Sequence, residues 1–181
     1  QVLAGTALAT ADTSLNVAGD ATLFADAVRS ANGAQLDFTI DGAFSLLARG
    51  APVSPIEGTT RLADASAALG GGFSLQADSV SIASQILMPA GSIALSATAG
   101  DLTLVSGALL DVAGNIRAFD THRVATGGGT VRLSATGQLG IAAGALVDVS
   151  GTLASGPDGR SEAAAAGTNM LRRRIREEGF T

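Results

Sequence analysis

The sequence predicts an all-β protein built as a β-solenoid, a stack of coils with three short strands each. The first observation is an internal repeat, because residues 92–114 and 130–151 have nearly the same sequence. The second is the alternation of apolar with small or polar residues in each copy, which is typical of strands with one buried face. The third is that each copy holds three such runs separated by Gly, Ala or Ser, which favours a coil over a hairpin.

The two copies match run by run. Residues 92–98 match 130–136 at an offset of 38, and 100–114 match 137–151 at an offset of 37, because Ala99 has no counterpart. We expect the alternating apolar residues to point inward: Ile93, Leu95, Ala97, Leu102, Leu104, Ala108, Leu110 and Val112 in the first copy, and Val131, Leu133, Ala135, Leu139, Ile141, Ala145, Val147 and Val149 in the second.

The pattern extends toward the N-terminus. Residues 73–75 match 93–95 at an offset of 20, which is the expected length of one coil. We therefore predict a solenoid over residues 1–151, with loop insertions at 48–72 and 115–128.

Two segments leave the prediction open. Residues 36–46 alternate cleanly, and the Asp41-Gly42 pair between their halves marks either a hairpin or a solenoid corner. Residues 152–181 lose the alternation, and 162–178 have a helix-forming composition of Ala, Arg and Glu. We expect an irregular or helical tail there, with disorder or out-of-frame sequence as the alternatives.

The composition suits a narrow tube better than an enzyme core. Hydrophobic residues make up 46% of the chain but aromatic residues only 3%, with no Trp and no Tyr. The net charge of −5 and the sparse surface charge do not suit a nucleic-acid phosphate backbone, so we expect no nucleic-acid partner. Without Cys there is no disulfide framework or thiolate metal site. The uncharged stretch 79–100 alternates and is interrupted by Pro89 and Gly91, so we expect no membrane-spanning segment.

The sequence contains none of the common catalytic motifs, and we expect a non-enzymatic protein without a cofactor. His122 is the only histidine, and Asp120 precedes it in the 115–128 insertion. These two residues are the candidate catalytic pair, in which Asp120 would orient a general base. A solvated loop histidine is the favoured interpretation. The glycine triplets at 70–72 and 127–129 are interpreted as corner loops and not as phosphate-binding loops.

Asp111 and Asp148 occupy equivalent places in the two copies, on the expected outward face. They would either bind a cation between coils or form ordinary solvated surface, which we favour. A carbohydrate-active enzyme with its site near 117–132 is the alternative function, because β-helical lyases and hydrolases use charged groups along an outer groove. The residues available for such a groove are Asp101 (with Gln138 at its equivalent place), Asp111, Arg117, Asp120, Arg123, Arg132 and Asp148.

The segments AGSIALSATAGDLTLVSGALLDVAG and GTVRLSATGQLGIAAGALVDVSG resemble the coils of filamentous haemagglutinin-like exoproteins. These are large adhesins that Gram-negative bacteria export by two-partner secretion. The resemblance covers mainly residues 72–151 and more faintly 13–46, and similar coils also occur in autotransporter passengers.

This resemblance implies a right-handed parallel β-helix that is secreted or held at the cell surface and acts as the shaft of an adhesin. Its partners would be a receptor or glycan on a host or neighbouring cell. An outer-membrane transporter would act through a domain that these residues do not contain, since the N-P-N-type motifs of the secretion domain are missing. End-to-end self-association through uncapped coils is a further expectation.

Overall fold

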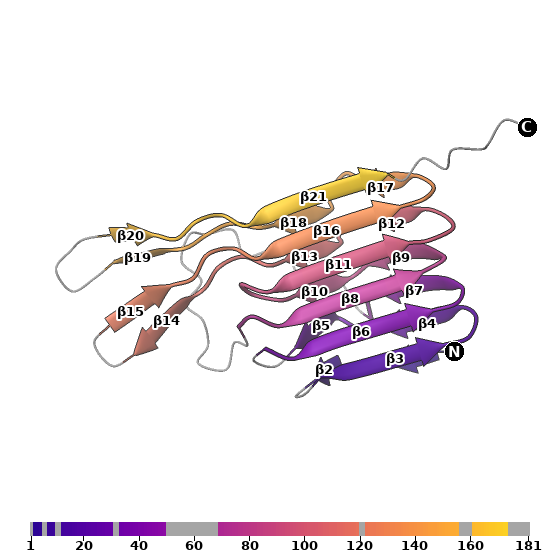
Figure 1. Ribbon diagram of the computed structural model, residues 1–181, viewed down its shortest axis with the longest axis horizontal. Coiled ribbons are helices and arrows are strands. Elements are labelled where there is room, and N and C mark those ends of the chain that lie inside the picture. Colours follow the sequence, from indigo (N-terminus) through magenta and orange to yellow (C-terminus); the bar gives the residue numbers. More distant parts are fainter. Residues whose placement is uncertain are drawn as a thin grey trace, which may run out of the picture.

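The computed structural model describes residues 2–4, 7–9, 12–30, 33–49, 69–119, 122–155 and 161–173. These residues form strands and connecting turns, with no helix among them. Seventeen of the strands belong to three sheets in which every pairing is parallel (Figure 1). The other four form two antiparallel hairpins. The predicted all-β class is therefore confirmed.

The strands are short and fall into sheets A, B and C. Sheet A contains β1 (Val2–Ala4), β4 (Ala21–Phe24), β7 (Ala43–Leu47), β9 (Ser79–Ala83), β12 (Leu102–Leu104) and β17 (Leu139–Ile141). Sheet B contains β2 (Ala7–Ala9), β5 (Ala27–Ser30), β10 (Gln85–Leu87), β13 (Leu109–Asp111) and β18 (Leu146–Asp148). Sheet C contains β3 (Thr13–Val17), β6 (Gln35–Ile40), β8 (Gly72–Ala77), β11 (Ser92–Ala97), β16 (Thr130–Ala135) and β21 (Thr168–Arg173). The hairpins are β14 (Ile116–Phe119) with β15 (His122–Ala125), and β19 (Leu153–Ser155) with β20 (Ser161–Ala163).

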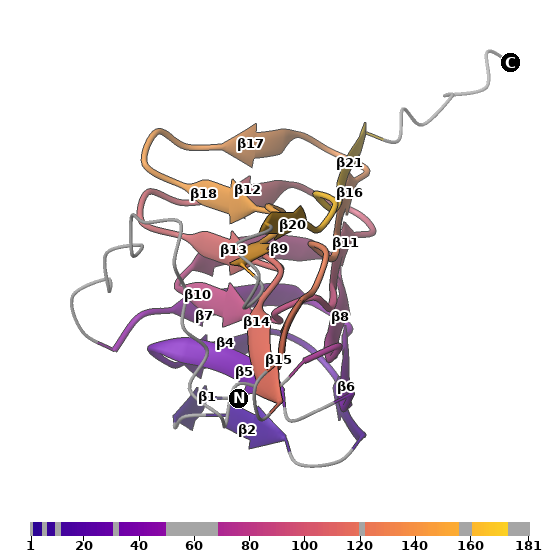
Figure 2. The same ribbon diagram turned by 90° about the vertical axis from the view of Figure 1, so that its left-hand side faces the viewer.

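The chain visits the sheets in the order C, A, B, and we call each such set of strands a rung. Figure 2 shows the rungs lying one above the other, with sheet C seen nearly edge-on at the right. Ile93 pairs with Phe73 and with Val131, while Leu102 pairs with Leu139, so the predicted offsets of 20, 38 and 37 are confirmed. This arrangement is consistent with a β-helix or solenoid.

Sheet B has one strand fewer than its neighbours. After β7 the chain leaves sheet A and returns in sheet C as β8, and β10 pairs directly with β5. The Ser84 hydroxyl donates a hydrogen bond of 2.6 Å to the carbonyl of Ala25, which ties the two neighbouring rungs of this sheet together. Most of the predicted insertion at 48–72 falls on residues 50–68, which lie outside the described part of the chain, and its last residue, Gly72, begins β8.

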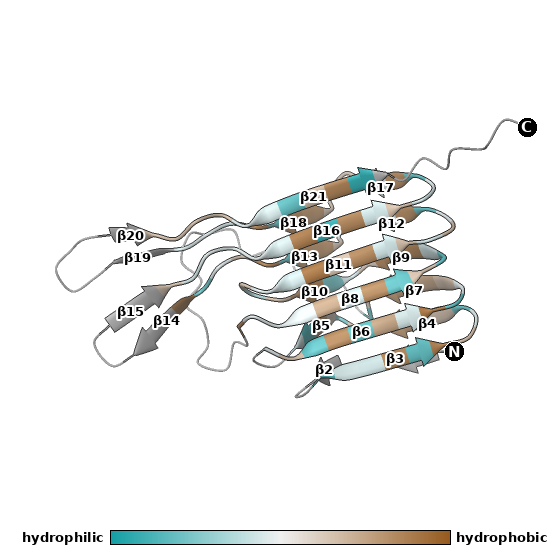
Figure 3. Ribbon diagram, in the orientation of Figure 1, coloured by the Kyte–Doolittle hydropathy of each residue, from teal (hydrophilic) through white to brown (hydrophobic). Residues whose placement is uncertain are grey.

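The interior is a set of apolar columns, mostly aliphatic, that run from rung to rung. Figure 3 shows apolar and polar residues alternating along the strands of sheet C, as a one-sided buried face requires. Phe38 lies edge-to-face against Phe44 and Phe73, with ring centroids 6.4 and 5.2 Å away. One such column in sheet C consists of Leu15, Phe38, Leu75, Leu95, Leu133 and Leu171, in register.

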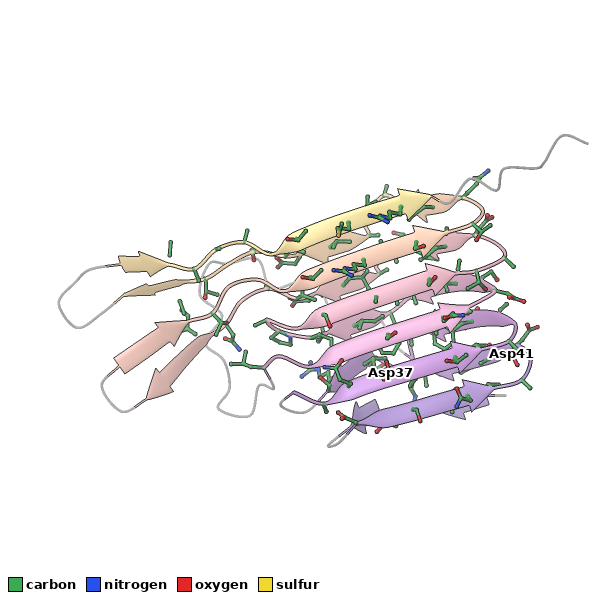
Figure 4. All side chains as sticks on the ribbon, viewed as in Figure 1. Asp37 and Asp41 are labelled. Atoms are coloured by element: carbon green, nitrogen blue, oxygen red, sulfur yellow. The ribbon has the colours of Figure 1, made fainter. Side chains whose placement is uncertain are left out.

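Asp41 and Gly42 form a corner and not a hairpin. Asp41 follows the end of β6, and the chain continues from sheet C into sheet A (Figure 4). Asp37 lies on the outward face of β6. The structure therefore decides the alternative that the sequence left open, because β6 and β7 belong to different sheets.

The helical expectation for the tail is wrong within its described residues. Residues 168–173 form β21, which pairs in register with β16 along six residues. The exposed edge of β16 offers a row of backbone partners, and this tertiary pairing outweighs the helix propensity of the local sequence. Sheet C thus continues beyond residue 151, while 156–160 and 174–181 are outside the described residues.

Candidate functional site

Both hairpins leave the stack at the same corner, between sheet B and sheet C. Hairpin β14–β15 connects β13 to β16, and hairpin β19–β20 connects β18 to β21. Figure 1 shows both projecting to one side, beyond the ends of the sheets. In the preceding rung residues 88–91 alone cross the corner. The hairpins are therefore additions to a corner that closes without them.

The root of the first hairpin is a buried polar cluster. Asn115 is 5% exposed, and its backbone N–H donates to the hydroxyl of Thr126 at 2.6 Å. The backbone N–H of Thr126 donates to the carbonyl of Asn115 at 2.8 Å. The Asn115 side chain accepts a bond of 2.8 Å from the N–H of Ile116. These hydrogen bonds join the two ends of the hairpin and fix the point where it leaves the stack.

The second hairpin is tied to the root of the first. The Thr152 hydroxyl lies 3.2 Å from the carbonyl oxygen of Asn115 and 3.0 Å from that of Thr126. The backbone N–H of Gly114 donates to Ser150 at 2.7 Å. The hairpins therefore share one hydrogen-bonded base, which we call the hairpin root (Asn115, Thr126 and Thr152).

Glycines at this corner let successive rungs approach closely. A Cβ on Gly91 would overlap the carbonyl oxygen of Gly71, and one on Gly129 would overlap that of Gly91. A Cβ on Gly167 would likewise overlap the carbonyl oxygen of Gly129. The triplets at 70–72 and 127–129 each supply one member of this glycine column (Gly71, Gly91, Gly129 and Gly167), which supports their interpretation as corner loops.

The candidate pair Asp120 and His122 lies on the first hairpin. His122 is the first residue of β15 and is opposite Phe119 in the register. The structure describes the backbone of His122 but not its side chain, and Asp120 is outside the described residues. The side chains of Arg117 and Arg123 on the same hairpin are likewise outside the description. The catalytic interpretation of this pair therefore stays a prediction.

Asp111 and Asp148 are adjacent in sheet B, because β13 pairs with β18. The expectation of solvated surface is wrong for Asp111, which is only 3% exposed. Its carboxylate turns back onto the chain and accepts a bond of 2.9 Å from the N–H of Ala113, while β18 covers it. Asp148 makes the equivalent contact with the N–H of Ser150 at 3.0 Å but is only partly buried. Both carboxylates therefore cap local turns.

Asp101 also binds the backbone. It accepts a hydrogen bond of 2.7 Å from the N–H of Gln138, the residue at the equivalent place in the next rung. Asp20 accepts a bond of 2.8 Å from the N–H of Ala43 in the same way. These corner carboxylates join one rung to the next. The sequence signal that could have revealed this role is the Asp that recurs at the corner before a strand of sheet A. The alternation within the strands does not reveal it.

In the described part of the chain, no three His, Asp or Glu side chains lie close enough together to hold a metal ion. Arg132 is exposed on the outward face of sheet C, in register with Ala94 and Met170. The described residues also contain no helix with the length and hydropathy needed to cross a membrane.

Comparisons with family models, with curated proteins and with solved structures found no match to this chain.

Proposed function

We propose that this chain is a segment of a right-handed parallel β-helix and serves as a non-catalytic shaft in a secreted or cell-surface bacterial adhesin. The observation that supports the proposal best is that the candidate groove aspartates bind the backbone of the protein itself. Asp101, Asp111 and Asp148, which the sequence offered for an outer groove, all accept hydrogen bonds from backbone N–H groups. Carboxylates engaged in this way hold a scaffold together.

The interior supports the same proposal. Aliphatic columns continue through three parallel sheets, and most of their members are fully buried. Burial of apolar surface contributes about 25 cal/mol per Å², so a stack of this kind gains stability with each added rung. A shaft requires length and rigidity, and both follow from repetition of one rung.

The two hairpins are the natural contact elements of such a shaft. They project from one corner and share the hairpin root, which holds their bases in a fixed position. The partner would be a receptor or glycan on another cell surface. The link to filamentous haemagglutinin-like exoproteins rests on the resemblance of residues 72–151, and an autotransporter passenger would have the same architecture.

Adhesion can be tested with beads coated with the 181-residue chain. We expect the beads to bind host or bacterial cells, or a glycan array, more strongly than uncoated beads. A variant without residues 115–128 keeps a four-residue connection between β13 and β16, as in the native corner at 88–91. It should keep its β-type circular dichroism and lose at least tenfold in bead retention.

Two outcomes would contradict the proposal. Equal retention of coated and uncoated beads on every surface removes the adhesin function. Release of sugars from a polysaccharide, lost on Asp120→Ala or His122→Ala, would instead establish the carbohydrate-active alternative. Arg29→Ala is the matched control, because Arg29 is an exposed charged residue on β5 that lies outside the hairpins and the candidate groove.

A further inference from the structure

The outward face of sheet C has its charges unevenly placed. Figure 1 looks onto this face, on which six strands lie side by side from β3 to β21. Its charged residues, among those described, are Asp37 on β6, Arg132 on β16 and Arg172 on β21, and all three are exposed. The acidic residue therefore lies in the half formed by β3, β6 and β8, and both arginines lie in the half formed by β11, β16 and β21.

The rest of this face is uncharged, and most of its side chains are small. Serine and threonine predominate, and no described outward position holds an aromatic ring. Small side chains let a second flat face approach closely, and they lose little rotamer freedom when they are covered. The uncharged outward positions are Ser14, Asn16, Gln35, Thr39, Gly72, Ser74, Gln76, Ser92, Ala94, Ser96, Thr130, Ser134, Thr168 and Met170.

Asp37 and Arg132 occupy one column of the register. Asp37 pairs with Ser74 on β8, and Arg132 pairs with Ala94 on β11. Ser74 and Ala94 pair with each other. Three strand spacings of about 4.8 Å therefore separate Asp37 from Arg132, and the resulting distance of about 14 Å is too long for an ion pair within one chain.

A two-fold axis between β8 and β11 brings these charges together across two copies of the chain. An axis along the strand direction inverts the order of the strands and keeps each residue in its column. Asp37 of each copy then faces Arg132 of the other. Packed sheets lie about 10 Å apart, a gap that an Arg and an Asp side chain span together. We propose that two copies of this chain pair through sheet C, face to face and with their stacks antiparallel.

The same axis leaves no like charges opposed at the described outward positions. It places Thr39 opposite Ser134, so that hydroxyl meets hydroxyl. It also places Arg172 opposite Asn16, whose side-chain oxygen can accept a hydrogen bond from the guanidinium group. The pairing is isologous, because each copy contributes the same surface.

The charges also select the antiparallel arrangement over a parallel one. A two-fold axis along the stack would keep the order of the strands and set Asp37 against Asp37 and Arg132 against Arg132. Like charges that face each other across an interface are unfavourable, and complementary charges fix its register. The one acidic and the nearest basic position of this face are therefore complementary only when the stacks run in opposite directions.

The area of the face is sufficient for a weak dimer. Six strands of up to six residues cover about 29 Å by 20 Å. Two such faces bury roughly 1,100 Å² in total, just above the ~1,000 Å² expected of a specific interface. Without an aromatic anchor, the charge pairs then decide how tightly the copies associate.

The test reverses one charge at a time. In the proposed dimer Asp37→Arg sets the new arginines against Arg132, and Arg132→Asp sets the new aspartates against Asp37. Both positions are exposed, so the fold should be unaffected, and circular dichroism with the thermal midpoint verifies this. Arg29→Asp is the matched control, because Arg29 is exposed on β5 in sheet B, away from this face.

Sedimentation equilibrium up to millimolar concentration measures the association. We expect the unmodified chain and Arg29→Asp to interconvert between one chain of 17.7 kDa and two. Each single reversal should raise the dissociation constant of the dimer at least tenfold. An equimolar mixture of Asp37→Arg with Arg132→Asp should dimerise about as strongly as the unmodified chain, because every charge then faces its opposite. A chain that carries both substitutions should do the same.

Three results would overturn the proposal. The unmodified chain could remain a monomer at every concentration. Both single reversals could associate as strongly as the unmodified chain, which would assign the contact to another surface, such as the edges of the outermost strands. The mixture could fail to dimerise although both variants are folded, which would exclude the antiparallel arrangement. None of these results depends on cell binding, so the proposal is tested separately from adhesion.

Discussion

Two stretches of nearly identical sequence have very different surroundings in this molecule. In the stretch 92–114, Leu104 is fully buried, whereas its counterpart Ile141 in the stretch 130–151 is 44% exposed. Leu109 and Leu146 differ in the same way, at 5% and 41%. The sequence pattern is the same in both, so it specifies which way a residue points. Burial depends on whether another rung lies above it.

The difference follows the strands one by one. In the outer rung, Val131 and Leu133 are buried because β21 lies above β16 in sheet C. Among the described residues no strand lies above β17 and β18 in sheets A and B, and Ile141 and Leu146 are exposed there. A single rung therefore contains both core and surface, which is expected when each rung contacts only its neighbours.

The largest expected effect comes from truncating a covered position. Leu104→Ala and Leu133→Ala should each reduce the free energy of unfolding by about 2–5 kcal/mol, because each leaves a cavity. Ile141→Ala should reduce it by less than about 1 kcal/mol, since much of that side chain is already in water. Urea unfolding at a concentration where the chain is monomeric measures all three. Equal losses would show that the outer rung is covered in solution.

A second comparison uses glycines with and without room for a side chain. A Cβ on Gly129 would overlap the carbonyl oxygen of Gly91, whereas one on Gly140 would have its nearest neighbour, Thr103, 3.9 Å away. We expect Gly129→Ala to destabilise the stack by about 1–3 kcal/mol through a forced backbone shift. Gly140→Ala should change stability by no more than about 0.5 kcal/mol. The difference in thermal midpoint between the two variants checks this, and equal midpoints would contradict the close approach.

The paired aspartates give a smaller contrast. Asp111→Ala leaves the buried N–H of Ala113 without its carboxylate, which should cost about 1–3 kcal/mol. Asp148→Ala should cost about 0.5–1 kcal/mol, because water can reach the N–H of Ser150. Asn at either position keeps an acceptor oxygen and should restore most of the stability. Chemical unfolding of the four variants tests the order, and a larger loss at Asp148 would contradict it.

Strand positions were predictable because alternation and offset are both local properties of the sequence. The offset of 20 between 73–75 and 93–95 and the offset of 38 to 131–133 reappear as the pairing register of sheet C. The exposure of Ile141 was not predictable, because the alternation shows which way a side chain points but not whether another rung covers it. The tail was misjudged for a related reason, since β21 forms against the edge of β16 and not from its own propensity.

The polar positions were harder to predict. Asp111 was expected on a solvated face, yet the turn that it caps and the rung above it enclose the carboxylate. The hairpin root was missed entirely, because Asn115, Thr126 and Thr152 are far apart in sequence and show no repeat. Their contacts arise only when two insertions leave the same corner of neighbouring rungs.

The smallest expected effect tests whether the two hairpins are coupled through that root. Thr152→Val removes the hydroxyl that lies 3.0 Å from the Thr126 carbonyl and should cost about 1 kcal/mol. Thr152→Ser keeps the hydroxyl and is the matched control. Because the loss falls at the base of the hairpins, we expect faster hydrogen exchange of the backbone amides of both Thr126 and Ala164, with little change in β11 or β12. Faster exchange at Ala164 alone would show that the two hairpins move independently. Neighbouring hairpins would then be uncoupled, whereas neighbouring rungs are joined by strand pairing along their whole length.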